Sequence, residues 1–165
     1  MNLKLKTHCP VCNMDININD IAYEYQNLKI FFCSNQCQER FITNPHLYIG
    51  HSGIAAAKQR GDHIIKKRII KLDQPVPDEI AELITTGLCD MMGIKEINID
   101  GENISISYDL LEVTAKQIET KIGLMGEYIK DNWVEHLKLA FVHYIEETEI
   151  DNLVQDTYSP HGHRH

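Results

Sequence analysis

Apolar and polar positions alternate in short runs along the second half of this chain of 165 residues. "HIIKKRIIKL", "IKEINID" and "NISISYD" have the period of strands, and a turn at Asp100-Gly101 joins the last two into a hairpin. "PDEIAELITTGLCDMM" has apolar residues at helical spacing and predicts a helix that begins near Pro77. "TAKQIETKIGLMG" predicts a second helix, capped by Thr114. With "EYIK" as a last strand, the predicted order is βαββαβ.

That order is typical of the ferredoxin-like fold, in which two helices cover one face of an antiparallel sheet. Beyond residue 131, "DNWVEHLKLAFVHYIEETEIDNLVQD" predicts a long amphipathic helix added to this plan. Its apolar stripe favours packing on the open sheet face or on the first domain, with a partner-binding surface as the alternative.

The N-terminal part has a different pattern. "DININDIAYEYQNLKIFF" predicts a hairpin with Asn27 near its turn. "NQCQERFI" predicts a short helix with Ser34 as its N-cap and an end before Pro45. We therefore expect an α+β protein with four parts: a small N-terminal domain over 1–50, a linker over 51–63, a ferredoxin-like domain with the C-terminal helix over 64–155, and a His-rich tail over 156–165.

Composition is that of a globular protein, with 43% hydrophobic and 24% charged residues. No run of 18 apolar residues and no signal-peptide pattern occurs, which predicts a cytoplasmic protein without membrane insertion.

Residues 1–63 carry six basic and five acidic residues, whereas residues 64–165 carry ten basic and nineteen acidic residues. Neither part has the clustered positive charge of a nucleic-acid-binding protein. Because glycine-rich phosphate loops and nucleophile motifs are also missing, we expect no enzymatic activity.

Four of the five cysteines fall within the first 37 residues, in the spacing C-x2-C, x20, C-x3-C. Thiols clustered in this way indicate a metal site more than disulfides. The first pair has the size of a metal knuckle, in which Asn13 takes a left-handed conformation. The second pair lies at a strand-to-helix change and points to one side of the helix. The expected ion is Zn²⁺, with Cu⁺ or an iron–sulfur cluster as alternatives. The predicted ligands are Cys9, Cys12, Cys33 and Cys37.

"CPVCNMDI" and "YEYQNLKIFFCSNQCQERFITNPHLY" resemble the YHS domain and its relative the TRASH domain, small treble-clef-like metal-binding modules. The likeness covers residues 8 to 49 and implies a role in heavy-metal sensing, transport or trafficking. Many members have three cysteines, with a residue such as Asp where Cys9 stands, so His8 is a possible substitute ligand. The matching positions are Cys12, Met14, Tyr25, Phe32, Cys33, Ser34, Cys37, Phe41, Pro45 and Tyr48.

Residues 64 to 130 are similar to the heavy-metal-associated (HMA) domain of copper chaperones and metal-transporting ATPases. The likeness rests on the apolar register ahead of "INID", which comprises Ile84, Leu88, Met91 and Ile94, and on "SISYD" before the second helix. HMA domains bind metal through a Met-x-Cys-x-x-Cys loop, and here Pro77 and Ile80 occupy the cysteine positions. Without soft ligands the family's Cu⁺ site cannot form, so we expect this domain to serve in recognition or docking.

Other sulfur and imidazole groups favour simpler interpretations. Cys89 and Met91 are expected in the core, because free cysteines and methionines are mostly buried. His46, His51 and His63 are expected at the surface. The tail histidines His161, His163 and His165 form a short tract that binds metal weakly or belongs to an unstructured terminus.

These patterns predict a non-enzymatic metal-binding protein that acts in heavy-metal trafficking or homeostasis. Its role would be that of a chaperone-like protein or a sensor, and its partner would be a metal transporter. A structural-zinc adaptor, whose acidic second domain binds a protein partner, is the rival hypothesis. An iron–sulfur redox protein is the third. The oligomeric state does not follow from the sequence.

Overall fold

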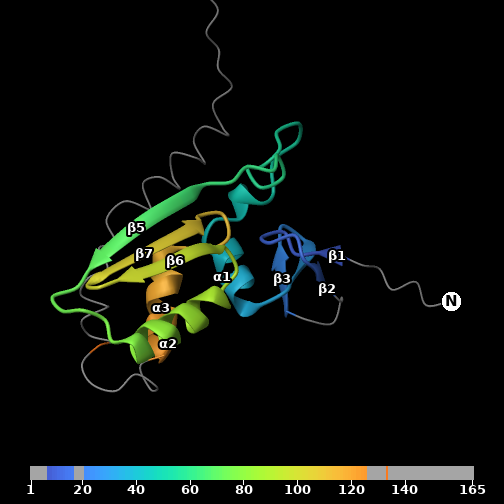
Figure 1. Cartoon of the computed structure of the whole chain (residues 1–165). Coiled ribbons are helices and arrows are strands. Elements are labelled where there is room, and N and C mark those ends of the chain that lie inside the picture. Colours follow the sequence, from blue (N-terminus) through green and yellow to red (C-terminus); the bar gives the residue numbers. More distant parts are fainter. Residues whose placement is uncertain (1–6, 17–20, 126–132, 134–165) are drawn as a thin grey trace, which may run out of the picture. The chain divides into compact units, whose positions relative to one another are not determined.

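The structure is a computed structural model that describes residues 7–16, 21–125 and Trp133 (Figure 1). The chain divides into two compact units, with a boundary between His63 and Ile64. The described part of the N-terminal unit is 7–16 and 21–63, and that of the second unit is 64–125 with Trp133. No helix among these residues is long and apolar enough to cross a membrane.

The described part of the N-terminal unit consists of two short antiparallel strand pairs followed by a helix. β1 pairs with β2 and β3 pairs with β4, both antiparallel. The helix α1 follows β4 directly, and a single 3-10 turn, η1, comes after it. The elements are β1 (Thr7–His8), β2 (Asp15–Ile16), β3 (Ile21–Tyr25), β4 (Leu28–Phe32), α1 (Asn35–Thr43) and η1 (Pro45–Leu47).

Local sequence signals fix the ends of these elements. Gln26 and Asn27 connect β3 to β4 with φ values of 49° and 63°, and a turn with two left-handed residues matches the twist of paired strands. Ser34 is the N-cap of α1, and Asn44, just before Pro45, ends the helix. The turn at Asn27, the cap and the helix end are confirmed, whereas the hairpin is shorter than predicted: it comprises Ile21–Tyr25 and Leu28–Phe32, and Asp15–Ile16 pair with β1 instead.

An aromatic cluster around Phe41 forms the core of the N-terminal unit. The ring of Phe41, on α1, lies 5.2 Å from that of Phe32, and 5.7 Å from those of Tyr25 and Tyr48. Phe32, Phe41 and Tyr48 are buried. These ring contacts hold the helix against the β3–β4 hairpin, which in turn fixes the strand end from which the helix starts.

The segment from Gly50 to Asp62 is hydrogen-bonded to the rest of the N-terminal unit. The Gln59 side-chain oxygen accepts from the backbone N–H groups of Gly50 and Ala56, at 3.2 and 2.9 Å. The N–H of Lys58 donates to the carbonyl of Leu47 at 2.9 Å. The sequence predicted a linker here, and in the structure the segment forms a folded loop.

Within the described residues 64–125, the second unit is a three-stranded antiparallel sheet with two helices. The strand order is β5-β7-β6, so the central strand is the last of the described strands in chain order. Both helices lie on the same face of the sheet (Figure 1). The elements are β5 (Ile65–Lys71), α2 (Asp78–Cys89), β6 (Ile94–Asp100), β7 (Asn103–Asp109) and α3 (Ala115–Met125).

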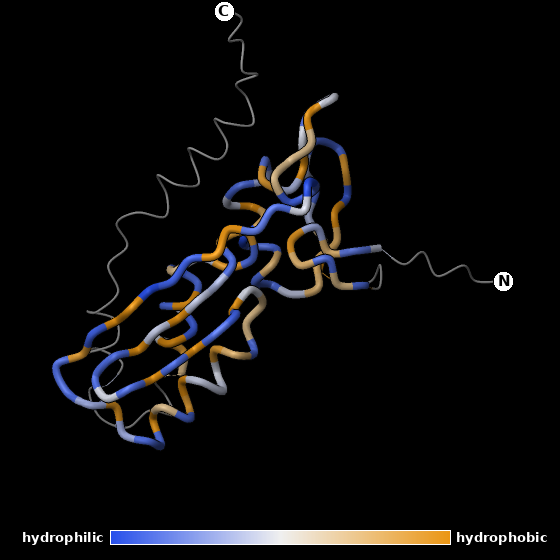
Figure 2. Tube along the Cα trace, turned by 45° about the horizontal axis from the view of Figure 1, so that its top comes forward, coloured by the Kyte–Doolittle hydropathy of each residue, from blue (hydrophilic) through white to orange (hydrophobic). Residues whose placement is uncertain are grey.

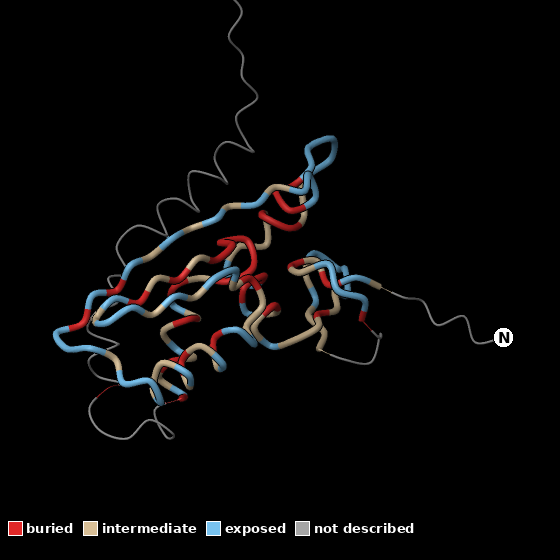
Figure 3. The backbone as a smooth tube through the Cα atoms, viewed as in Figure 1, coloured by how far each residue is buried: buried red, intermediate tan, exposed pale blue. Residues whose placement is uncertain are grey.

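Alternation along the central strand builds the core of the second unit. On β7, Ile104, Ile106 and Tyr108 are buried, whereas the intervening Ser105 and Ser107 are only partly so. Figure 2 shows this alternation of hydropathy along the strands, and Figure 3 shows that buried residues recur on strands and helices. The buried helical residues are Ile84 and Leu88 of α2, and Ala115, Ile118, Ile122 and Met125 of α3.

The helix ends of this unit follow their predicted caps. Thr114 and Gln117 cap α3 reciprocally: the N–H of Gln117 donates to Thr114 Oγ1 at 3.2 Å, and the N–H of Thr114 donates to Gln117 Oε1 at 3.1 Å. Gly93 has a φ of 88°, a left-handed conformation that turns the chain from α2 into β6. Pro77 precedes α2 as its N-cap.

The described residues establish a mixed helix-and-strand protein, as expected for the α+β class. The strand predicted at "EYIK" and nearly all of the predicted C-terminal helix lie outside the described residues, as does the His-rich tail. The ferredoxin-like fold thus stays a prediction. Of the C-terminal helix only Trp133 is described, and it is buried with 8% of its surface exposed.

Candidate metal centre

The turn between β1 and β2 positions the first pair of cysteines. The N–H of Cys9 donates to the carbonyl of Met14 at 2.9 Å, and the N–H of Asn13 donates to the carbonyl of Cys9 at 2.8 Å. Asn13 has a φ of 62°, the left-handed conformation predicted for it. This tight turn lets Cys9 and Cys12 face the same point.

The start of α1 positions the second pair. Cys33 directly follows β4, and Cys37 lies one helical turn later, so the two side chains share a face. Ser34 Oγ accepts a hydrogen bond from the backbone N–H of Cys37 at 3.3 Å. It also accepts from the thiol of Cys33 at 3.6 Å. Ser34 therefore ties the helix start to both thiols.

The four predicted ligands meet in space. The Sγ atoms of Cys9, Cys12, Cys33 and Cys37 all lie within 4.8 Å of one another. The Cys12–Cys33 distance is 3.3 Å and the Cys33–Cys37 distance is 3.5 Å. Thiolates around one tetrahedral ion, at about 2.3 Å from it, are separated by about 3.8 Å. The cluster has the size and the donor chemistry of a site for a single metal ion.

The thiols interact strongly enough to change one another's acidity. Hydrogen bonds from the thiols of Cys12 and Cys37 hold the pKa of Cys9 far below its ordinary value. Bonds with Cys12 and Cys9, together with burial, raise the pKa of Cys37 far above it. For Cys12, the bond to Cys37 lowers the pKa, but the bond to Cys9 and burial outweigh it, so that the pKa rises to about 12.

Backbone hydrogen bonds also lower the pKa values of Cys9 and Cys12. Hydrogen bonds from the backbone of Cys12 and Cys33 lower the pKa of Cys9, and one from Met14 lowers that of Cys12. Cys9 thus ionises readily, whereas Cys12 and Cys37 keep their protons beside the resulting negative charge. A cation is what allows all of the thiols to ionise together.

Burial of the four cysteines is uneven. Cys9 and Cys37 are fully buried, whereas Cys12 and Cys33 are half-buried. The half-buried thiols come from different pairs, one from the knuckle and one from the helix start. The cluster is consequently closed on one side and reachable by solvent on the other.

His8, proposed as a substitute ligand, has another partner. Its Nδ1 lies 2.7 Å from a carboxylate oxygen of Asp15, and both side chains are largely exposed. The two residues are cross-strand partners in β1 and β2. Sequence reasoning missed the role of Asp15, although the register of a hairpin around the "CPVCN" turn places it opposite His8.

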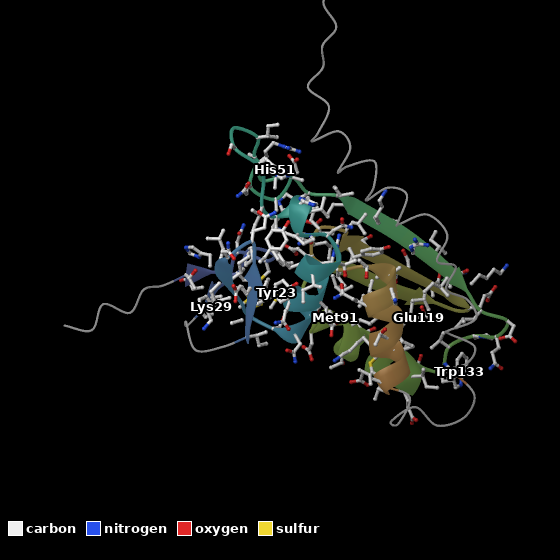
Figure 4. All side chains as sticks on the ribbon, turned by 180° about the vertical axis from the view of Figure 1, so that it is seen from behind. Tyr23, Lys29, His51, Met91, Glu119 and Trp133 are labelled. Carbon is white, nitrogen blue, oxygen red and sulfur yellow. The ribbon has the colours of Figure 1, made fainter. Side chains whose placement is uncertain are left out.

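The other cysteine and histidine residues that the structure describes do not belong to the cluster. Cys89 is exposed at the end of α2, so its predicted core position is wrong; the last turn of a helix is easily left uncovered by the core. The rings of His46 and His51 lie 5.6 Å apart in the N-terminal unit, and Figure 4 shows His51 on the loop after η1. The cysteine cluster is the one group of three or more potential metal ligands among the described residues.

The loop ahead of α2 contains no thiol, in line with its sequence. Residues 72–77 are held at the β6–β7 turn, because the N–H of Leu72 donates to the carbonyl of Glu102 at 2.9 Å and that of Val76 to the carbonyl of Gly101 at 3.0 Å. The second unit therefore has a fixed loop at this place but no soft metal ligands in it.

These features define a two-unit protein with a four-cysteine centre that could hold a metal ion. No protein-family model, no curated protein and no solved structure matches the chain.

Proposed function

We propose that this protein is a zinc-binding, non-enzymatic protein of heavy-metal trafficking or homeostasis, in which Cys9, Cys12, Cys33 and Cys37 hold one Zn²⁺ ion. The observation that carries the proposal is the meeting of the four Sγ atoms within 4.8 Å of one another. Cu⁺ would also accept thiolates, but a site of four converging donors suits a tetrahedral ion best. The unpaired thiols suit a reducing, cytoplasmic compartment.

Packing of the thiols favours one ion over an iron–sulfur cluster. In a polynuclear cluster the cysteines bind different iron atoms, which spreads their sulfur atoms farther apart than ligands of one ion. Here Cys33 lies 3.3 Å from Cys12 and 3.5 Å from Cys37, shorter than the ideal spacing around a single Zn²⁺ of about 3.8 Å. The order of knuckle, hairpin and helix supports the treble-clef-like, YHS- or TRASH-type resemblance.

The half-buried Cys12 and Cys33 support a trafficking role. Transfer of a metal proceeds by ligand exchange, so an acceptor must reach at least part of the thiolate shell. In this proposal the second unit, which lacks metal ligands in its α2 loop, recognises a protein partner such as a metal transporter. The likeness to HMA domains and the acidic charge of residues 64–143, which carry fourteen acidic and nine basic residues, motivate that assignment.

The second candidate is a structural-zinc adaptor. The N-terminal unit has a small core around Phe41, and units of this size commonly depend on a metal for stability. Cys9 and Cys37 are fully buried, as in a closed structural site. In this case the metal would hold the first unit together, and binding of a protein partner by the second unit would be the function.

Elemental analysis tests the shared claim. Protein purified under reducing conditions without added metal should contain one equivalent of zinc. The Cys33→Ser variant should lose it, and Cys89→Ser, which removes the exposed thiol outside the cluster, should retain it. A wild-type protein without stoichiometric metal would refute the proposal, and stoichiometric iron with visible colour would favour the redox alternative.

Competition separates the two candidates. The zinc-loaded protein is treated with a modest chelator while amide hydrogen exchange is followed in both units. Loss of zinc with retained protection in α1 supports trafficking. Loss of zinc together with loss of protection throughout the N-terminal unit supports the structural role, because folding is then coupled to metal binding.

A further inference from the structure

Cys12 and Cys33 differ from the other two thiols of the cluster in two independent ways. They are the half-buried members, whereas Cys9 and Cys37 are fully buried. Their Sγ atoms are 3.3 Å apart, closer than the Sγ atoms of Cys33 and Cys37, which are 3.5 Å apart. The two thiols that solvent can reach are thus each other's close neighbours, although 21 positions separate them in the chain.

We infer that Cys12 and Cys33 are a redox-sensitive modification site, at which a peroxide joins the two thiols in a disulfide and thereby releases the metal ion. The inference rests on the metal binding proposed above and adds the regulation of that site. Sequence spacing alone points to other pairs, because Cys9–Cys12 and Cys33–Cys37 are the neighbours along the chain. Spatial proximity and exposure select the pair that crosses between knuckle and helix.

The chemistry balances with a peroxide as the oxidant. The Cys33 thiolate attacks one oxygen of hydrogen peroxide, forming a sulfenic acid as the O–O bond breaks, and the hydroxide that leaves takes a proton from solvent. The Cys12 thiolate then attacks the sulfenic sulfur, so that the S–S bond forms and a second hydroxide leaves and is protonated. The two thiolates lose two electrons in total, and the peroxide becomes two water molecules.

Release of the ion follows from the loss of donors. A disulfide sulfur is no longer a thiolate, so the ion retains only Cys9 and Cys37 of its four ligands. The same disulfide forms whichever half-buried thiol reacts with the peroxide first, since the other is the resolving thiol in both cases. Cys37 is a poorer resolving group, because it is buried and held in α1, where Ser34 accepts its backbone N–H at 3.3 Å.

Disulfide mapping tests the inference on the full chain. The zinc-loaded Cys89→Ser protein is treated with one equivalent of hydrogen peroxide, then alkylated, digested and analysed by mass spectrometry. We expect the first disulfide to link Cys12 with Cys33 and one zinc ion to be released per disulfide formed. A thiol reductant followed by added zinc should restore the loaded protein. The wild-type chain, treated in the same way, should give the same link.

Other links would overturn the inference. A first disulfide between Cys9 and Cys12, or between Cys33 and Cys37, would show that spacing along the chain decides the reaction. Zinc release without any disulfide, or over-oxidation to sulfinic acid, would also overturn the inference. The reduced, metal-free protein is mapped in parallel. If the chain binds no metal, the proposed function fails. The metal-free protein still shows whether the Cys12–Cys33 disulfide forms first, so the two claims fail separately.

Discussion

Ser34 Oγ accepts the backbone N–H of Cys37 at 3.3 Å, so the residue that starts α1 also fixes the orientation of a candidate metal ligand. The same oxygen accepts a hydrogen bond from the Cys33 thiol. One side chain therefore joins the strand end, the helix start and two of the four thiols. Without this cap the first turn of α1 would lose the hydrogen bond that holds Cys37 in place.

Substitution of that cap should loosen the helix. We expect Ser34→Ala to destabilise the N-terminal unit by about 1 kcal/mol, because the N–H of Cys37 loses its acceptor. Amide exchange in α1 should become roughly fivefold faster. Ser52→Ala is the matched control, since Ser52 is exposed in the loop after η1. Equal effects of the two substitutions would contradict the capping role.

Metal affinity should increase with pH. In the metal-free protein the raised pKa values of Cys12, about 12, and of Cys37 keep both thiols protonated near neutrality. Cys9, whose pKa is lowered, is already ionised. Binding of Zn²⁺ must then displace protons from Cys12 and Cys37, so the metal-free state binds more protons and a higher pH favours the loaded state. Calorimetry in buffers of different ionisation enthalpy measures the protons released, and an affinity independent of pH would refute this assignment.

Truncation of two isoleucines of one sheet should destabilise the second unit to very different degrees. Ile106 of β7 is 1% exposed on the face covered by the helices, whereas Ile69 of β5 is 68% exposed on the other face. We expect Ile106→Ala to lower the free energy of unfolding of the second unit by about 2–5 kcal/mol, through lost burial and the cavity left behind. Ile69→Ala should cost less than about 1 kcal/mol. Denaturant unfolding of both variants provides the measurement, and similar costs would mean that the helices do not cover this face.

Two glycines with left-handed backbones should also differ. A Cβ on Gly93 would lie 2.7 Å from Glu112 Cβ and 2.9 Å from Val113 Cγ1, whereas one on Gly101 would meet nothing within 4 Å. Gly101→Ala should cost about 1–2 kcal/mol from backbone strain alone. Gly93→Ala should cost about 1–3 kcal/mol more, because its neighbours must also move. Thermal unfolding compares the two, and a smaller loss at Gly93 would contradict the close packing against Glu112.

Much of the secondary structure was predictable because its signals are local. Strand alternation in "NISISYD", the turn at Asp100-Gly101 and the caps Ser34 and Thr114 each depend on residues a few positions apart. The spacing of the cysteines likewise indicated a metal site. These features need no knowledge of what packs against them.

Tertiary structure decided which of these residues meet and which face solvent. The hairpin β3–β4 and the Phe41 cluster bring the knuckle and the helix start together, so Cys12 is closer to Cys33 than Cys37 is. Tertiary packing also decided that Cys89 is exposed and that His8 pairs with Asp15. The sequence by itself determined the elements and the thiol-rich chemistry, because backbone preferences and spacing act over a few residues. Burial and distance between remote residues depend on packing across the whole unit, which the tertiary structure alone supplies.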